Sequence, residues 1–152
     1  MGNPYVQKET SKIFESYEYP KNAALAAAWI MAHYKGINLK IFQAEESTSL
    51  CDFNIIGSVE NTVQAKTIVD EIQEALKKGG CEVISLEGVS DGEWILLDMG
   101  DVIVHVFQDL SREYFDLDSL WQDNEQLPIP QEFYFSQQND PKQGSENTEN
   151  YF

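Results

Sequence analysis

The spacing of apolar residues predicts two helices in the first half of the chain. Residues 22–35 are rich in alanine and place Leu25 and Trp29 on one face at helical spacing. A second helix is predicted to begin after Asn61, a good N-cap, and to end at Gly79. Its apolar stripe, the clearest in the chain, consists of Ala65, Ile68, Val69, Ile72 and Leu76.

Alternating or continuous apolar runs predict a sheet for these helices to cover. The predicted strands occupy residues 37–42, 51–57, 81–86, 93–98 and 101–107. The last two form a hairpin, because Gly100 at the connection can adopt the positive φ that a tight turn requires. Residues 111–115 are expected to add a further strand, and residues 117–121 a single helical turn. The pattern therefore predicts an α/β (α+β) domain, with a small sheet of about five strands packed by two main helices.

Both ends of the chain differ in character from the predicted domain, which spans residues 21–127. Residues 1–20 look like an N-terminal extension of uncertain order. Beyond the domain, Pro128 and Pro130 interrupt regular structure. The chain that follows is acidic and rich in Gln, Asn and Ser, so it cannot bury enough apolar area to order itself. We expect residues 128–152 to form a flexible, acidic, low-complexity tail.

The net charge restricts the classes of partner. The chain has 152 residues, enough for one domain, and its 26 acidic and 10 basic residues give a net charge of −16. Such a chain is repelled by nucleic acid and by anionic lipid, so neither is expected as a partner. It suits a basic protein, because opposite fields steer encounter. The acidity also serves solubility, and this simpler interpretation stays open.

The chain shows no mark of secretion or membrane insertion. No apolar run approaches the ~20 residues of a membrane span, and the first residues resemble neither a signal peptide nor a transit peptide. Cys51 and Cys81 lie far apart and in no paired motif, which favours two inert thiols over a disulfide or a zinc site. A bacterial cytoplasmic protein is the expectation.

Three residues of the predicted hairpin invite a metal-site interpretation. Asp98 and Asp101 flank the turn, but His105 lies roughly 13 Å farther along the return strand, so the three do not converge. Gly57-Ser58, between a strand and a helix, offers a place for a phosphate. The carboxylate pair that nucleotidyl transfer needs for magnesium is missing after it. A metal-dependent nucleotidyltransferase or phosphohydrolase is thus an alternative; we expect no catalytic residue, metal or cofactor.

Residues 91–121 concentrate the side-chain types that anchor protein interfaces. Arg112 also has a simpler interpretation, an ion pair with a neighbouring acid such as Asp109 or Glu113. Trp121, beside two leucines, is expected to fill the core. An acidic rim around these residues would face a basic partner, and a generic acidic adaptor is a further alternative. The candidate contacts are Trp94, Asp98, His105, Phe107, Arg112, Tyr114 and Phe115.

The same segment strongly resembles the Iojap-like ribosomal silencing factor family, RsfS. That family has a tryptophan and an apolar triplet, then Asp-x-Gly-Asp, then an apolar run with a histidine, then Arg-Glu-aromatic-aromatic-x-Leu and Leu-Trp. Here these are Trp94, Ile95-Leu96-Leu97, Asp98-Met99-Gly100-Asp101, Val102-Ile103-Val104-His105-Val106, Arg112-Glu113-Tyr114-Phe115, Leu117 and Leu120-Trp121. Glu87-Gly88 also matches, whereas Val59-Glu60 replaces the family's glycine-containing turn. The resemblance covers residues 22–121.

The resemblance implies a small mixed sheet with a nucleotidyltransferase-like topology but no such activity. It implies binding to the large ribosomal subunit through ribosomal protein L-fourteen, a basic protein at the subunit interface. Occupying that surface would block joining of the small subunit and repress translation. A homodimer is a further expectation from the family.

Overall fold

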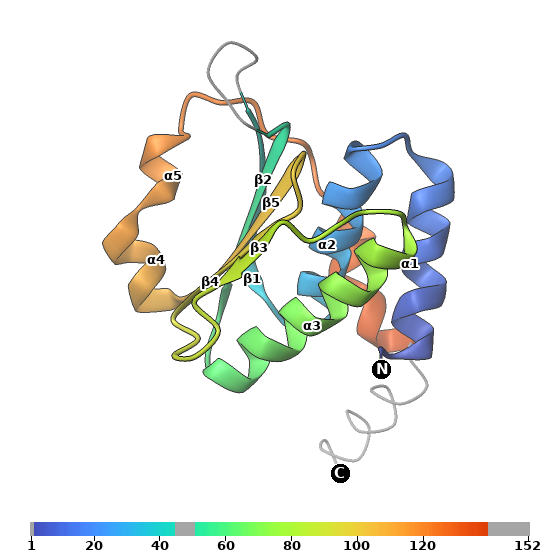
Figure 1. Ribbon diagram of the computed structural model, residues 1–152, viewed down its shortest axis with the longest axis horizontal. Helices are drawn as coiled ribbons and strands as arrows, with labels where there is room; N and C mark the ends of the chain where they lie inside the picture. Colours follow the sequence, from blue (N-terminus) through green and yellow to red (C-terminus); the bar gives the residue numbers. More distant parts are fainter. Residues whose placement is uncertain (1, 45–50, 140–152) are drawn as a thin grey trace.

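A five-stranded sheet lies between two helical layers of unequal size, as Figure 1 shows. The structure is a computed structural model that describes residues 2–44 and 51–139. Three longer helices lie on one side of the sheet, with α2 and α3 against it and α1 outside them, and two short helices lie over the other side. The longer helices are α1 (Pro4–Ser16), α2 (Lys21–His33) and α3 (Thr62–Lys78), and the short ones are α4 (Asp109–Phe115) and α5 (Leu117–Leu120).

The sheet is mixed, as predicted. Its order is β1-β2-β5-β4-β3, in which β2 and β5 run parallel and all other neighbours run antiparallel. The predicted hairpin joins β4 to β5 through Gly100, whose φ is 88°. The single-domain α/β fold expected from the sequence is therefore confirmed. The strands are β1 (Ile37–Gln43), β2 (Phe53–Val59), β3 (Ser85–Glu87), β4 (Trp94–Asp98) and β5 (Val102–Gln108).

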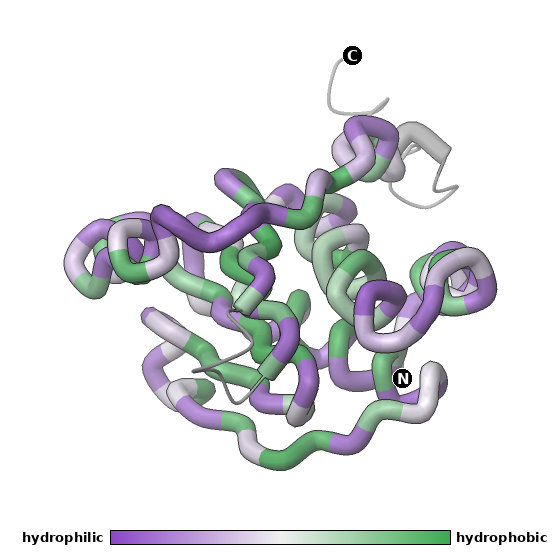
Figure 2. Tube along the Cα trace, turned by 90° about the horizontal axis from the view of Figure 1, so that it is seen from above, coloured by the Kyte–Doolittle hydropathy of each residue, from purple (hydrophilic) through white to green (hydrophobic). Residues whose placement is uncertain are grey.

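Strand side chains alternate between the two faces and so divide the core in two. Ile41 and Val106 point toward the layer of long helices and belong to the main core. Their chain neighbours Phe42 and Phe107 point the other way and are the centre of a smaller buried cluster. Figure 2 shows hydrophobic stretches gathered in the interior, with hydrophilic stretches mainly toward the outside. Both faces of the sheet are thus buried over part of their area.

Helix α2 is enclosed on nearly all sides, which explains its alanine content. Every residue from Asn22 to His33 is buried. Small side chains let α1, α3 and the sheet approach the helix closely, and α1 contributes Val6 and Ile13 to the main core. In the part of the chain that the structure describes, no helix is long and apolar enough to cross a membrane.

Residues 1–20, whose order the sequence left open, contain helix α1 and pack on the domain. Asn3 caps the helix, since its side-chain oxygen accepts a hydrogen bond from the backbone nitrogen of Tyr5 at 2.9 Å. The backbone nitrogen of Asn3 donates to the carboxylate of Glu71 on α3 at 3.1 Å. The Asn-Pro start was the available sequence signal, because asparagine at the N-cap and proline at N1 favour a helix.

The segment after α5 is ordered as far as the structure describes it, contrary to the predicted flexible tail. The backbone nitrogen of Leu127 donates to the carbonyl of Ile41 at 2.8 Å, which extends the edge of β1. A 3-10 helix, η1 (Gln131–Asn139), then packs on α2 and buries Phe133. Leu127, Ile129 and Phe133 supply the apolar contacts with the main core that the polar composition of this stretch concealed. Residues 140–152 of the predicted tail lie outside the described residues.

Some other local predictions were wrong. Residues 111–115 continue helix α4 and add no strand. The strand predicted at 81–86 is reduced to β3, and Cys81 precedes it as a buried free thiol. Ile37, at the start of the strand predicted over residues 37–42, is exposed, and the register between β1 and β2 shifts between Ile37 and Lys40. Helix α2 begins at Lys21 and ends at His33, within two residues of the helix predicted over residues 22–35.

Two glycines with positive φ allow a matched test of the loop that leads into β4. A Cβ on Gly88 (φ 82°) would lie 1.9 Å from the backbone oxygen of Trp94, whereas a Cβ on Gly80 (φ 94°) would meet no heavy atom within 4 Å. We expect Gly80→Ala to cost about 1 kcal/mol from its left-handed backbone alone. Gly88→Ala should cost about 3 kcal/mol, because strain and the clash add. Urea unfolding measures both losses, and equal losses would contradict the packing of this loop.

Candidate protein-docking site

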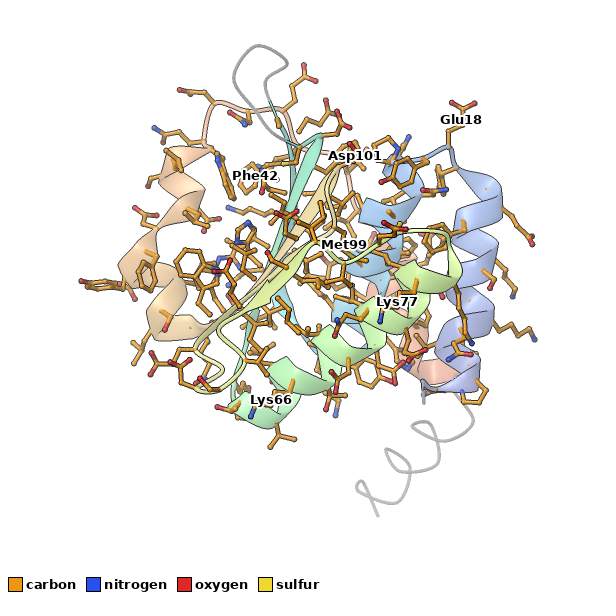
Figure 3. All side chains as sticks on the ribbon, viewed as in Figure 1. Glu18, Phe42, Lys66, Lys77, Met99 and Asp101 are labelled. Atoms are coloured by element: carbon orange, nitrogen blue, oxygen red, sulfur yellow. The ribbon has the colours of Figure 1, made fainter. Side chains whose placement is uncertain are left out.

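The second face of the sheet is covered by an aromatic cluster, which consists of Phe42, Trp94, His105, Phe107, Phe115 and Trp121. Alternation along β1, β4 and β5 places four of these residues on one face, and the other two are Phe115 at the end of α4 and Trp121 directly after α5. The Trp94 ring stacks on Phe107 with centroids 4.8 Å apart and packs against Phe115 at 4.7 Å. Figure 3 shows side chains filling the space between the short helices and the sheet, with the labelled Phe42 on the side of the sheet that faces these helices.

A short chain of hydrogen bonds fixes His105 within this cluster. The Trp94 indole nitrogen donates to Nδ1 of His105 at 3.3 Å. An indole can only donate, so the imidazole proton lies on Nε2, which donates to Oδ1 of Asn54 at 3.2 Å. Burial lowers the pKa of His105 to about 4, so the ring is neutral at neutral pH. His105 thus lies beside Trp94 and not at the hairpin turn, as expected from its distance along the strand from Asp98 and Asp101.

An ion network ties the two short helices to each other and to the sheet; its members are Arg112, Asp118, Lys40 and Ser58. Arg112 donates to both carboxylate oxygens of Asp118, through Nε at 3.0 Å and Nη2 at 3.0 Å. Its Nη1 donates to the hydroxyl of Ser58 at 2.9 Å, and Lys40 pairs with Asp118 at 3.0 Å. Hydrogen bonding by Arg112, with Lys40 assisting, lowers the pKa of Asp118 to about 2. Arg112 does pair with an acid, although not with Asp109 or Glu113.

The outer side of the short helices is apolar and exposed. We call this surface the α4–α5 face and define it by Leu110, Tyr114, Phe115 and Leu120. Leu110 and Tyr114 are each 82% exposed and stand one helical turn apart. Acidic side chains accompany them, and a hollow beside the ion network is lined by Asp109, Glu113, Asp116 and Asp118. Exposed large apolar side chains within an acidic surround are typical of a docking site for a basic protein.

The structure separates the seven predicted contacts by accessibility. Tyr114 and Phe115 are exposed, and Trp94 and Asp98 are partly exposed. The side chains of three others are buried and face the protein interior: His105, Phe107 and Arg112. The Phe115 ring contacts both the buried Phe107 ring, with centroids 6.3 Å apart, and the exposed Tyr114 ring, with centroids 5.0 Å apart. The contact role of the accessible residues stays a prediction.

Leu110 and Leu120 are exposed members of the α4–α5 face that sequence reasoning missed. Residues 111–115 were predicted as a strand, which hid the helical spacing of Leu110 and Tyr114. Leucine is also the residue expected in a core, so its exposure could not be predicted from its type. The four-residue spacing was the one available signal.

The residues proposed for nucleotidyl transfer have other roles. Asp98 accepts a hydrogen bond from the backbone nitrogen of Gly100 at 2.9 Å and so stabilises the hairpin turn. Gly57 and Ser58 lie inside β2 rather than after it, and the Ser58 hydroxyl is bound by Arg112. Among residues 2–44 and 51–139, no group of three His, Cys, Asp or Glu side chains is placed to hold a metal ion. Burial also raises the pKa of Cys51 and of Cys81, which disfavours reactive thiolates.

The neutral state of His105 makes stability depend on pH. In the unfolded chain the ring protonates near pH 6.5, whereas in the folded protein its pKa is about 4. Stability is therefore fully present above pH 6.5 and is lost as the pH falls toward 4, by about 3 kcal/mol. We expect His105→Gln to lack this loss. Urea unfolding of both proteins from about pH 7 to about pH 4 measures it, because all other titrations cancel in the difference. Parallel pH profiles would show that His105 titrates normally.

The sequence and the fold of this chain match those of a known protein family. Residues 17–151 match the family described as "Ribosomal silencing factor during starvation". The ribosomal silencing factor RsfS of Chromobacterium violaceum is 34% identical over 87 residues, which cover 57% of this chain and 71% of that protein. RsfS of Halalkalibacterium halodurans is 36% identical over 74 residues, which cover 49% of this chain and 63% of that protein.

A solved structure agrees with the sequence relatives. A crystal structure of a protein from Chromobacterium violaceum superposes with a TM-score of 0.61 at 30% identity, over 76% of this chain and 85% of that chain. A more distant relative in mouse, 24% identical over 84 residues, covers 53% of this chain and 37% of that protein and is named mitochondrial assembly of ribosomal large subunit protein 1. The fold, the motif from Trp94 to Trp121 and the match over residues 17–151 lead to one conclusion: the chain belongs to the ribosomal silencing factor family.

Proposed function

We propose that the protein docks on the large ribosomal subunit through ribosomal protein L-fourteen, and that its bulk then excludes the small subunit and represses translation. The observation that carries this proposal is the α4–α5 face, an exposed apolar surface with acidic neighbours. The family supplies the ribosome as partner in general terms. The name of the mouse relative supports the large subunit in particular.

The chemistry of the face suits a basic ribosomal protein. Tyrosine and other aromatic side chains contribute much of the binding energy of protein interfaces when a partner covers them. Tyr114 and Phe115 stand outward on α4, and three acids of the neighbouring hollow, Asp109, Glu113 and Asp116, would meet lysine or arginine side chains of the partner. The net charge of −16 adds long-range attraction to such a partner and repulsion from bare ribosomal RNA. Together these properties favour a protein contact on the ribosome over a nucleic-acid contact.

Catalysis has no part in this mechanism. Steric exclusion requires only that the bound domain occupy space that the small subunit needs, so affinity and position decide its effect. Trp94 and Asp98, partly exposed at the start and end of β4, complete the predicted contact set, and Trp94 packs against Phe115 of the face. The buried residues His105 and Phe107 support the face from beneath and do not touch the partner.

The double variant Leu110→Ala/Tyr114→Ala tests the assigned face. Both side chains are 82% exposed, so the fold should survive their truncation. We expect affinity for purified large subunits to fall by about tenfold or more, since two central apolar contacts are lost. Val63→Ala is the matched control, because Val63 is 75% exposed on α3 in the opposite layer. Binding that is unchanged in the double variant, or equally weakened in the control, would place the contact elsewhere.

Competition with purified ribosomal protein L-fourteen tests the assigned partner. We expect the free ribosomal protein to displace the large subunit from the wild-type chain at a concentration near its own dissociation constant. A different basic ribosomal protein of similar charge serves as the control, because it reproduces the electrostatic attraction without the specific surface. Equal competition by both proteins would indicate a generic acidic adaptor.

A further inference from the structure

We infer that Arg112 and Asp118 are positioning residues for docking: they hold the α4–α5 face in its binding geometry without touching the partner. The inference rests on the proposed function for the identity of the partner. Arg112 and Asp118 are two largely buried charged side chains, and contact with a partner alone would not explain their presence there. It also explains why an arginine, the side chain type most expected to contact a partner, is only 8% exposed here.

The short helices cannot hold their own geometry. Helix α4 has seven residues and α5 has four, far below the length at which an isolated helix is stable in water. They meet at Asp116, which has a left-handed backbone conformation (φ 49°, ψ 50°) and accepts a hydrogen bond from Ser119 of α5. Such a corner is strained for a residue other than glycine, so contacts elsewhere must maintain it.

The ion network supplies those contacts at the inner side of the corner. The guanidinium of Arg112 on α4 grips the carboxylate of Asp118 on α5 with two hydrogen bonds, a geometry that fixes both distance and orientation. Ser58 then anchors the guanidinium to β2, and Lys40 anchors the carboxylate to β1. Two helices and two strands therefore meet at one pair of charges.

The same pair determines where the exposed aromatics point. Arg112 and Tyr114 are two residues apart on α4, so they project from roughly opposite sides of the helix. Arg112 is held on the sheet side, and Tyr114 is thereby directed outward. A face held in advance loses less conformational freedom on binding than one that must fold against its partner. Loss of the network should therefore weaken docking although no contact with the partner is removed.

Asp118→Asn tests the inference with two readouts. The variant keeps the shape of the side chain and removes its charge. We expect amide hydrogen exchange to accelerate in residues 109–121 while β2, β5 and α3 keep their protection. Affinity for purified large subunits should fall by about tenfold. Arg112→Lys, which keeps the charge but loses the two-point grip, should show a smaller change of both readouts.

Asp123→Asn is the matched control, because it removes the same charge from an exposed site three residues after α5. We expect it to leave exchange unchanged and affinity within about twofold, as long-range attraction alone would give. If the Asp118→Asn protein exchanges normally but binds weakly, Asp118 is itself a contact residue. If it exchanges fast but binds normally, the rigidity of the α4–α5 face does not matter for docking. Either result overturns the inference while the Leu110→Ala/Tyr114→Ala loss still supports the face. A wild-type chain that fails to bind large subunits overturns the proposed function and this inference together.

Discussion

The need to cover a second apolar sheet face with very little chain is the constraint on which this structure depends. Three long helices bury the first face, whereas eleven residues of helix in α4 and α5 remain for the other. Large aromatic side chains cover the area that so little helix leaves open, since Phe115 packs against Trp94 and Trp121 packs against Phe42. The ion network solves the problem of rigidity, because it fastens the corner between the helices to β1 and β2. Covering the sheet thinly also leaves the outer side of the same helices without a partner.

The exposed outer side acquires its selectivity from charge. Apolar side chains alone do not distinguish one partner from another, but an acidic surround favours a basic protein and repels nucleic acid. Neutral His105 keeps positive charge out of the cluster beneath, and the low pKa of Asp118 keeps the network ionised at any physiological pH. The neutral histidine and the ion network therefore hold the apolar α4–α5 face rigidly in place, and acidic residues surround that face.

The sequence predicted the fold well where its periodicity was strong. Helix α3 and the β4–β5 hairpin were predicted to within a few residues, because Asn61 caps the helix and Gly100 makes the turn. Helix α4 was mistaken for a strand, since seven residues are too few to distinguish the two periods. Helix α1 and η1 were missed because their order comes from packing on α2, which local composition does not record. The candidate site was found from residue types, but burial, which only the fold determines, showed that Arg112 and Phe107 lie inside.

The association of ribosomal subunits in the presence of the protein measures directly whether the bound chain excludes the small subunit. Purified large subunits are saturated with the chain, small subunits are added, and light scattering follows the formation of whole ribosomes, with co-sedimentation to confirm that the chain is bound. If exclusion is steric, subunit association falls in proportion to the fraction of large subunits that carry the chain. Replacing the wild-type chain by the Leu110→Ala/Tyr114→Ala variant restores association. Normal association with the wild-type chain still bound to the large subunit would contradict steric exclusion.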